Sequence, residues 1–192
     1  MNRETWLNKA IAALSKDIFK PMLDGRAIPD SIKVSVGFPA GSRGANMSAI
    51  GQCWNPLASG GNFIEIFISP VLDEPSRVLD VLCHEMVHAI VGLDAKHGPK
   101  FRSLAVAIGL TGRMTATEAS PELAEKLAGI AKKIGTFPHA ALQPEESGRK
   151  KQTTRLIKVS CPTCDNVARQ SRTAFLLYGL MCGTCQEQME AV

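Results

Sequence analysis

Two histidines and a glutamate follow the HExxH pattern in His84-Glu85-Met86-Val87-His88. On an α-helix, residues four positions apart lie about 40° apart around the axis and one turn along it. Both imidazoles can therefore bind one metal ion, at about 2.0–2.1 Å for zinc, with Glu85 close enough to take a proton from a bound water. The alternative is a chance match to a short pattern, with two satisfied histidines in the core.

The flanking residues predict that this helix is buried. Pro75-Ser76 is a helix start signal, and the helical pattern continues to about Leu93. Apolar residues cover most of the circumference, namely Val78, Leu79, Val81, Leu82, Met86, Val87, Ile90 and Val91. Histidine and glutamate are costly to bury unless a metal or another partner satisfies them, so the context favours a metal site.

A catalytic zinc usually has three protein ligands and one open position. The third of the four histidines, His97, follows soon after the predicted helix. If that helix ends near Leu93-Asp94, the chain can turn back and present His97 to the same ion. The residues alone are equally compatible with a helix-capping or solvated loop histidine, so both interpretations stay open.

The cysteines indicate a second metal site. Four of the six form two CxxC pairs separated by 17 residues, Cys161, Cys164, Cys182 and Cys185. Two such pairs can close a tetrahedral shell of thiolates, which is structural because no position stays open for a substrate. Zinc is the default metal and iron the alternative, while a pair of disulfides is disfavoured in a reducing compartment. Cys53 and Cys83 lie in apolar runs and are interpreted as buried thiols.

The elements that must position these residues predict an α+β fold. An amphipathic helix over about Glu4–Phe19 precedes three strand candidates, whose short connections predict a small antiparallel sheet. Helices follow from about Pro75, Gly98 and Pro121. We expect a first domain over residues 1–135, a linker over 136–155, and over 156–192 a zinc ribbon that is too short to fold without its metal.

The order of these features resembles the SprT-like metallopeptidases: strands, HEMVHA on a helix, a short connection, HGPKF, and later a CxxC…CxxC module. The resemblance is clear over roughly residues 50–110 and looser over the ribbon. It implies a zincin-like domain in which His84, His88 and His97 bind a catalytic zinc and Glu85 is the catalytic base. The substrate would then be a protein or peptide.

Basic residues gather in the linker and the start of the ribbon. Residues 149–172 contain seven basic residues and one acidic residue, Asp165. The basic residues are Arg149, Lys150, Lys151, Arg155, Lys158, Arg169 and Arg172. They form either a nucleic-acid contact surface or a solvated basic linker. The eukaryotic relative of the resembling family, Spartan, is a DNA–protein crosslink protease, which favours DNA. The net charge of +4 permits such contact without requiring it.

The first residues of the chain lack the apolar core of a signal peptide, and no stretch has the roughly 18–20 apolar residues of a membrane span. We therefore expect a cytoplasmic protein. The leading hypothesis is a zinc metalloendopeptidase with one catalytic and one structural zinc, acting on peptide bonds, including those of DNA-associated proteins. The alternative is a non-catalytic DNA-associated or transcription-linked zinc-ribbon binding protein, which would have no chemical need for Glu85.

Overall fold

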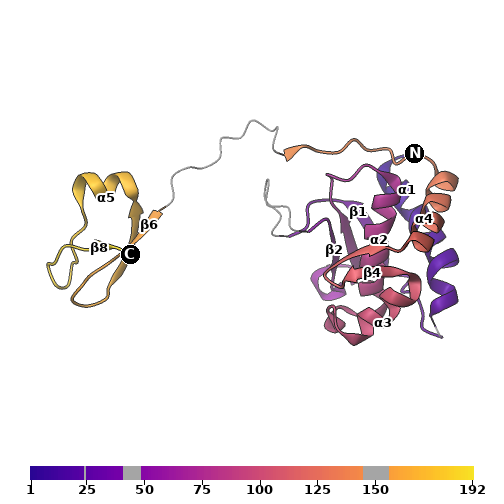
Figure 1. Ribbon diagram of the computed structural model, residues 1–192, viewed down its shortest axis with the longest axis horizontal. Coiled ribbons are helices and arrows are strands. Elements are labelled where there is room, and N and C mark those ends of the chain that lie inside the picture. The colour runs from indigo at the N-terminus through magenta and orange to yellow at the C-terminus, as the bar shows by residue number, and fades with distance from the viewer. Residues whose placement is uncertain (24, 41–48, 145–155) are drawn as a thin grey trace. The chain divides into compact units, whose positions relative to one another are not determined.

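The computed structural model describes residues 1–23, 25–40, 49–144 and 156–192. The chain divides into two compact units, Met1–Ser147 and Gly148–Val192, which Figure 1 draws in indigo to orange and in yellow. Helices and small sheets together confirm the predicted α+β class. Within the described ranges, no helix combines the length and the apolar character needed to cross a membrane.

The first unit contains four α-helices, shorter helical turns and two small sheets in its described part. The helices are α1 (Arg3–Leu14), α2 (Pro75–Val91), α3 (Pro99–Ile108) and α4 (Pro121–Ile134). The turns are the π-helical η1 (Ser15–Phe19) and the 3-10 turns η2 (Lys20–Met22), η3 (Pro56–Ala58) and η4 (Leu93–Ala95). The strands are β1 (Ile32–Val36), β2 (Gly51–Trp54), β3 (Ile64–Ile68), β4 (Leu110–Arg113) and β5 (Ala116–Ala119).

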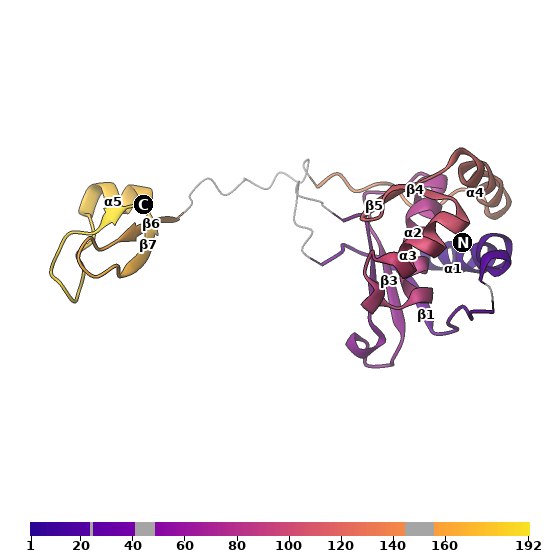
Figure 2. The ribbon, with the colours of Figure 1, turned by 60° about the horizontal axis from the view of Figure 1, so that its bottom comes forward.

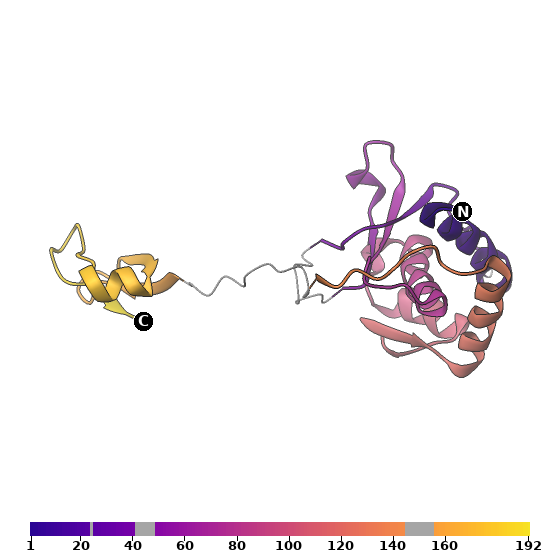
Figure 3. The ribbon, with the colours of Figure 1, turned by 90° about the horizontal axis from the view of Figure 1, so that it is seen from above.

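The larger sheet corrects one prediction. Its strand order is β1-β3-β2, with β2 antiparallel to β3 but β1 parallel to β3, so the expected antiparallel sheet is wrong for β1. Alternating apolar residues identified the strands, but this local pattern carries no information about which edge of β3 each strand joins. Figure 3 shows the β2–β3 hairpin extending beyond the neighbouring helices, with η3 near its tip. Its place at the end of the order β1-β3-β2 makes β2 an edge strand of this sheet.

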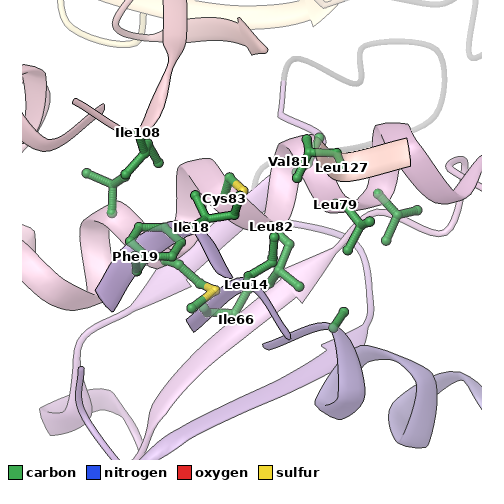
Figure 4. Close-up of a cluster of buried hydrophobic side chains, with 14 of the residues drawn as sticks. Leu14, Ile18, Phe19, Ile66, Leu79, Val81, Leu82, Cys83, Ile108 and Leu127 are labelled. Carbon is green, nitrogen blue, oxygen red and sulfur yellow. The ribbon is translucent and has the colours of Figure 1, made fainter. Parts of the chain in front are cut away.

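The core lies between the sheet and the helices. Figure 4 shows Leu14 and Phe19 from the first helical segment meeting Ile66 from β3 and Leu82 from α2. All four side chains are fully buried. Because α2 contacts the sheet, α3, α4 and β5, the helix that carries HExxH is held on several sides at once.

The β4–β5 hairpin was not predicted from the sequence. Its strands are four residues each and pair from Leu110↔Ala119 to Arg113↔Ala116. The segment is rich in small and hydroxyl side chains, and β5 buries only Thr117, so it lacks the apolar alternation by which strands are recognised. Figure 2 shows β4 and β5 beside α2 and α3.

Residues 136–144, which the composition places in the linker, belong to the first unit and pack against its other elements. Phe137 is 2% exposed, and its ring lies 4.9 Å from that of Trp6. The Trp6 indole donates a hydrogen bond to the Gly135 carbonyl at 2.8 Å, and His139 Nε2 donates one to the Pro70 carbonyl at 2.7 Å. The contacts of Phe137 and His139 therefore extend the packed part of the unit past α4. The remainder of the expected linker, residues 145–155, lies outside the described residues.

The second unit is a small sheet with one short helix. The strand order is β7-β6-β8, with every pairing antiparallel. The elements are β6 (Leu156–Ser160), β7 (Val167–Ser171), α5 (Arg172–Tyr178) and β8 (Glu190–Ala191). Over residues 156–192, the apolar residues that are buried are Val159, Cys161, Cys182 and Met189. So small a core agrees with the expectation that a metal must stabilise this unit.

Candidate active site

Helix α2 places two histidines and a glutamate at one site. Glu74 caps its start by accepting hydrogen bonds from the backbone N–H groups of Ser76 and Arg77. The helix ends at Gly92, whose φ of 86° is a left-handed conformation that glycine adopts without strain. Ten of its 17 residues are buried. The side chains of its inner face are therefore held firmly, as a catalytic group requires.

A tight connection returns the chain to the same site. After η4, Lys96 has a φ of 46°, which reverses the chain direction just before α3. This turn brings His97 Nε2 to 3.2 Å from His88 Nε2 and 3.3 Å from His84 Nε2. Of the two interpretations left open for His97, the geometry supports the one in which it joins the other two histidines.

The three imidazoles fit a zinc ion. With bonds of about 2.0–2.1 Å, two ligands of a tetrahedral zinc lie about 3.3–3.4 Å apart. The Nε2 separations of 3.2 Å (His88–His97) and 3.3 Å (His84–His97) match this spacing. Phe101, fully buried in α3, lies beneath the cluster, with ring centroids 4.9, 4.4 and 5.0 Å from those of His84, His88 and His97. The aromatic residue of HGPKF thus packs against all three imidazoles.

The electrostatics also suit a metal. Burial, followed by repulsion from His97, lowers the pKa of His84 to about 4. Burial, followed by repulsion from the other two histidines, lowers the pKa of His88 to about 3. Burial alone lowers the pKa of His97. At neutral pH all three rings are therefore uncharged and offer the lone pairs that zinc requires.

Glu85 lies against the edge strand β2. Its side chain is buried, and this burial raises its pKa to about 8, opposed in part by a hydrogen bond with the Cys53 backbone. The carboxylate fits because position 51 is glycine. A Cβ atom there would lie only 2.5 Å from Glu85 Oε1. Gly51 is thus required for the close approach of α2 to β2.

A groove joins these groups. A cavity of about 630 Å³ is lined by the three histidines and Glu85 at its base. Residues 49–53, which include most of β2, and residues 115–118 of the β4–β5 hairpin also line it. Arg77 and Lys96 also line it. The site is therefore open to a ligand that lies between two strand edges.

Thr117 is the residue of this site that the sequence reasoning missed. Its Oγ1 atom lies 2.8 Å from His84 Nδ1, and its side chain is 8% exposed, whereas its neighbours Ala116 and Glu118 are exposed. No motif marks such a position. The signal available was a threonine among short β-forming residues shortly after HGPKF. Asp80, which lies one turn before His84 on α2, pairs with Arg77.

The four cysteines of the second unit come together as a separate cluster. All their sulfur atoms lie within 4.8 Å of one another, and Cys164 Sγ is 3.6 Å from Cys182 Sγ. A disulfide would be about 2.0 Å long, whereas two sulfurs on a tetrahedral zinc with bonds of about 2.3 Å lie about 3.7–3.8 Å apart. All four are free thiols, so the arrangement fits a metal and excludes the disulfide alternative.

Both CxxC pairs form the same knuckle. The N–H of Asp165 donates to the Cys161 carbonyl, and the N–H of Gln186 donates to the Cys182 carbonyl. Asp165 and Gln186 have φ values of 56° and 57°, the left-handed conformation that closes each turn. Hydrogen bonds from the Cys185 and Thr184 backbones lower the pKa of Cys182 to about 6. The second knuckle therefore favours a thiolate at Cys182, the form that binds metal, whereas the neighbouring thiols raise the pKa of Cys185.

Three of the seven predicted nucleic-acid-binding residues fall within the described part of the chain. Lys158 and Arg169 are exposed and lie opposite each other in the β6–β7 pairing, and Arg172 is exposed at the start of α5. Over residues 156–192 these three are matched in number by three acids, Asp165, Glu187 and Glu190. The other four, Arg149, Lys150, Lys151 and Arg155, lie outside the described residues.

Comparison with known proteins gives one match. Residues 42–121 match the SprT-like family. The matched segment includes β2, α2, the turn to His97, α3 and the β4–β5 hairpin, and so every residue of the histidine site. No curated protein and no solved structure gave a match.

Proposed function

We propose that this chain, whose residues 42–121 match the SprT-like family, is a zinc metalloendopeptidase with a zincin-like catalytic domain. The observation that carries the proposal is the convergence of three histidine Nε2 atoms beside a buried glutamate at the base of an open groove. His84, His88 and His97 would hold the zinc. A zinc ion in this position supplies a more acidic water and a Lewis acid for the scissile carbonyl.

The role of Glu85 follows from its surroundings. A carboxyl group whose pKa is raised to about 8 by burial is poised to accept and release a proton near neutral pH. In the proposed reaction Glu85 takes the proton of the attacking water and later gives it to the leaving amine. Among the described residues no cation is paired with Glu85, and its hydrogen bond with the Cys53 backbone offsets only part of the effect of burial on its pKa. This argues for catalysis over the alternative of a non-catalytic binding protein.

The groove favours an extended peptide as substrate. Strand β2 pairs with β3 along one edge, and its other edge is free of pairing with a described strand. A substrate strand lying along β2, opposite the hairpin, could form backbone hydrogen bonds regardless of its sequence. Most strands of a folded protein already have their backbone groups paired, so we expect cleavage mainly of unfolded or locally extended segments.

The second unit would be a zinc ribbon with a structural metal, since four thiolates leave no open position. DNA is the proposed partner of the basic residues around it, among which Lys158 and Arg169 share one face of the β6–β7 pair. DNA-bound proteins would then be brought to the catalytic domain. Four clustered cysteines without a disulfide also support the proposal of a reducing compartment such as the cytoplasm.

The proposal is tested by cleavage of an unfolded, fluorescently labelled protein by zinc-loaded enzyme, with and without single-stranded DNA. Glu85→Gln keeps the size of the side chain but removes the base, and should abolish cleavage while zinc stays bound. Glu118→Gln is the matched control, because Glu118 lines the same groove but is exposed. Equal cleavage by wild type and Glu85→Gln, or none by wild type under any condition, would reject the peptidase proposal.

A further inference from the structure

The three histidines of the site differ in what their second ring nitrogen contacts. All three direct Nε2 toward the common centre. Within the described ranges, a hydrogen-bond partner for Nδ1 is recorded for His84 alone, and it is Thr117 Oγ1 at 2.8 Å. One ligand of the proposed zinc is thus oriented by a specific side chain.

We infer that Thr117 is a positioning residue, which sets the tautomer and the ring orientation of His84 for zinc binding. This inference rests on the proposed zinc site. When Nε2 donates its lone pair to a metal, the ring proton must lie on Nδ1, and Nδ1–H then donates to the Thr117 hydroxyl oxygen. In the other tautomer the proton would lie on Nε2 and block the metal.

The fold gives Thr117 the rigidity that this role needs. Thr117 is the buried residue of β5, and its backbone pairs with Gly112 across the hairpin. Strand β5 also contacts both α2 and α4. The Thr117 hydroxyl therefore belongs to a strand that packs against the helix carrying His84. A solvent-exposed side chain would not hold the His84 ring in one orientation in this way.

The same placement links the substrate groove to the metal. Residues 115–118 line the groove in which a substrate would lie along β2, so Thr117 contacts the ligand histidine from the hairpin that lines this groove. A shift of the hairpin on substrate binding would be transmitted to the His84 ring through one hydrogen bond.

The test uses the full-length chain and three variants. Thr117→Val keeps the shape of the side chain and removes the hydroxyl, and Thr117→Ser restores the hydroxyl. Thr115→Val makes the same substitution at an exposed position that lines the same groove. Zinc affinity at the histidine site is measured by chelator competition. In a parallel cobalt-substituted sample, thiolate-to-cobalt charge-transfer absorption reports the four-cysteine site separately, and this site serves as the internal reference.

We expect Thr117→Val to weaken zinc binding at the histidines by about 10- to 100-fold, with Thr117→Ser and Thr115→Val close to wild type. Imidazole NMR of the zinc-loaded protein should show a slowly exchanging Nδ1–H on His84 that becomes fast-exchanging in Thr117→Val. This readout separates loss of the hydrogen bond from a general loss of stability.

Two results would overturn the inference: an unchanged zinc affinity in Thr117→Val, or a Thr117→Ser variant that binds zinc as poorly as Thr117→Val. In either case the histidines of the wild type would still hold zinc, and the proposed function would stand. Absence of zinc from the histidines of the wild type would instead reject the proposed function and the inference together.

Discussion

Gly51→Ala should separate catalysis from metal binding. A Cβ atom at this position would lie 2.5 Å from Glu85 Oε1 and 2.6 Å from Val81 Cγ1. Ordinary contact begins at 3.4 Å, so the carboxylate would have to move by 3.4 − 2.5, or about 0.9 Å. The backbone at position 51 is in a β-strand that alanine adopts without strain, so the effect would be purely one of contact.

A displacement of this size is large for a general base. Misplacement by about 1 Å can lower a rate by roughly 10²-fold, whereas overpacking costs about 1–3 kcal/mol of stability. We therefore expect kcat/KM on an unfolded protein to fall by roughly 10²-fold. Zinc content should be unchanged, because the added methyl group faces Glu85 and not the histidines.

The assay compares kcat/KM, zinc content and thermal unfolding for wild type, Gly51→Ala and Gly60→Ala. Gly60→Ala is the matched control, because a Cβ atom there would meet nothing within 4 Å. If Gly51→Ala cleaves as fast as wild type while Glu85→Gln is inactive, the placement of the Glu85 carboxylate against β2 is not what sets the rate. The reasoning from this contact would then be refuted.

Three further predictions concern metal, thiols and pH. Cys164→Ser should release the ribbon zinc and expose residues 156–192 to proteolysis without altering the unfolding of the first unit; a protease-resistant ribbon would contradict this. Cys53 and Cys83 should resist iodoacetamide until the protein unfolds, because burial raises the pKa of Cys53 to about 12 and that of Cys83 still further; alkylation of either in the native protein, seen by mass spectrometry, would argue against their burial. The pH prediction uses metal-free Glu85→Gln, because the Glu85 carboxyl would have the opposite pH dependence. The free energy of unfolding of this variant should fall from pH 6.5 toward pH 4. The folded-state pKa of His88 is lowered to about 3, so the unfolded chain binds more protons in this range. The same variant carrying His88→Asn should show a shallower fall by calorimetry, and equal slopes would refute the assignment.

The parts of the site that could be predicted are those fixed by local geometry. The spacing of His84 and His88 sets their common helix face before any tertiary contact forms. The two CxxC pairs likewise define their knuckles locally, and the structure closes them with Asp165 and Gln186 in the left-handed conformation. Neither assignment depends on how the rest of the chain folds.

The parts that could not be predicted depend on contacts between residues that are far apart in the sequence. The position of His97 depends on the turn at Gly92 and Lys96, and the residues alone left its role open. Strand β1 pairs in parallel with β3. The alternation of apolar residues along one strand does not encode the direction or the partner of its pairing. Thr117 reaches His84 across 33 positions in the sequence through a hairpin with no apolar signature.

The most direct test of the account is the zinc content per chain by elemental analysis, in wild type and in His97→Ala, Cys164→Ser and Glu85→Gln. We predict two zinc ions in wild type, one after dialysis against a mild chelator in His97→Ala and in Cys164→Ser, and two in Glu85→Gln, which should nevertheless cleave no protein. One zinc per chain in wild type, unaffected by His97→Ala, would contradict the claim that this chain carries a catalytic metal site beside a structural one.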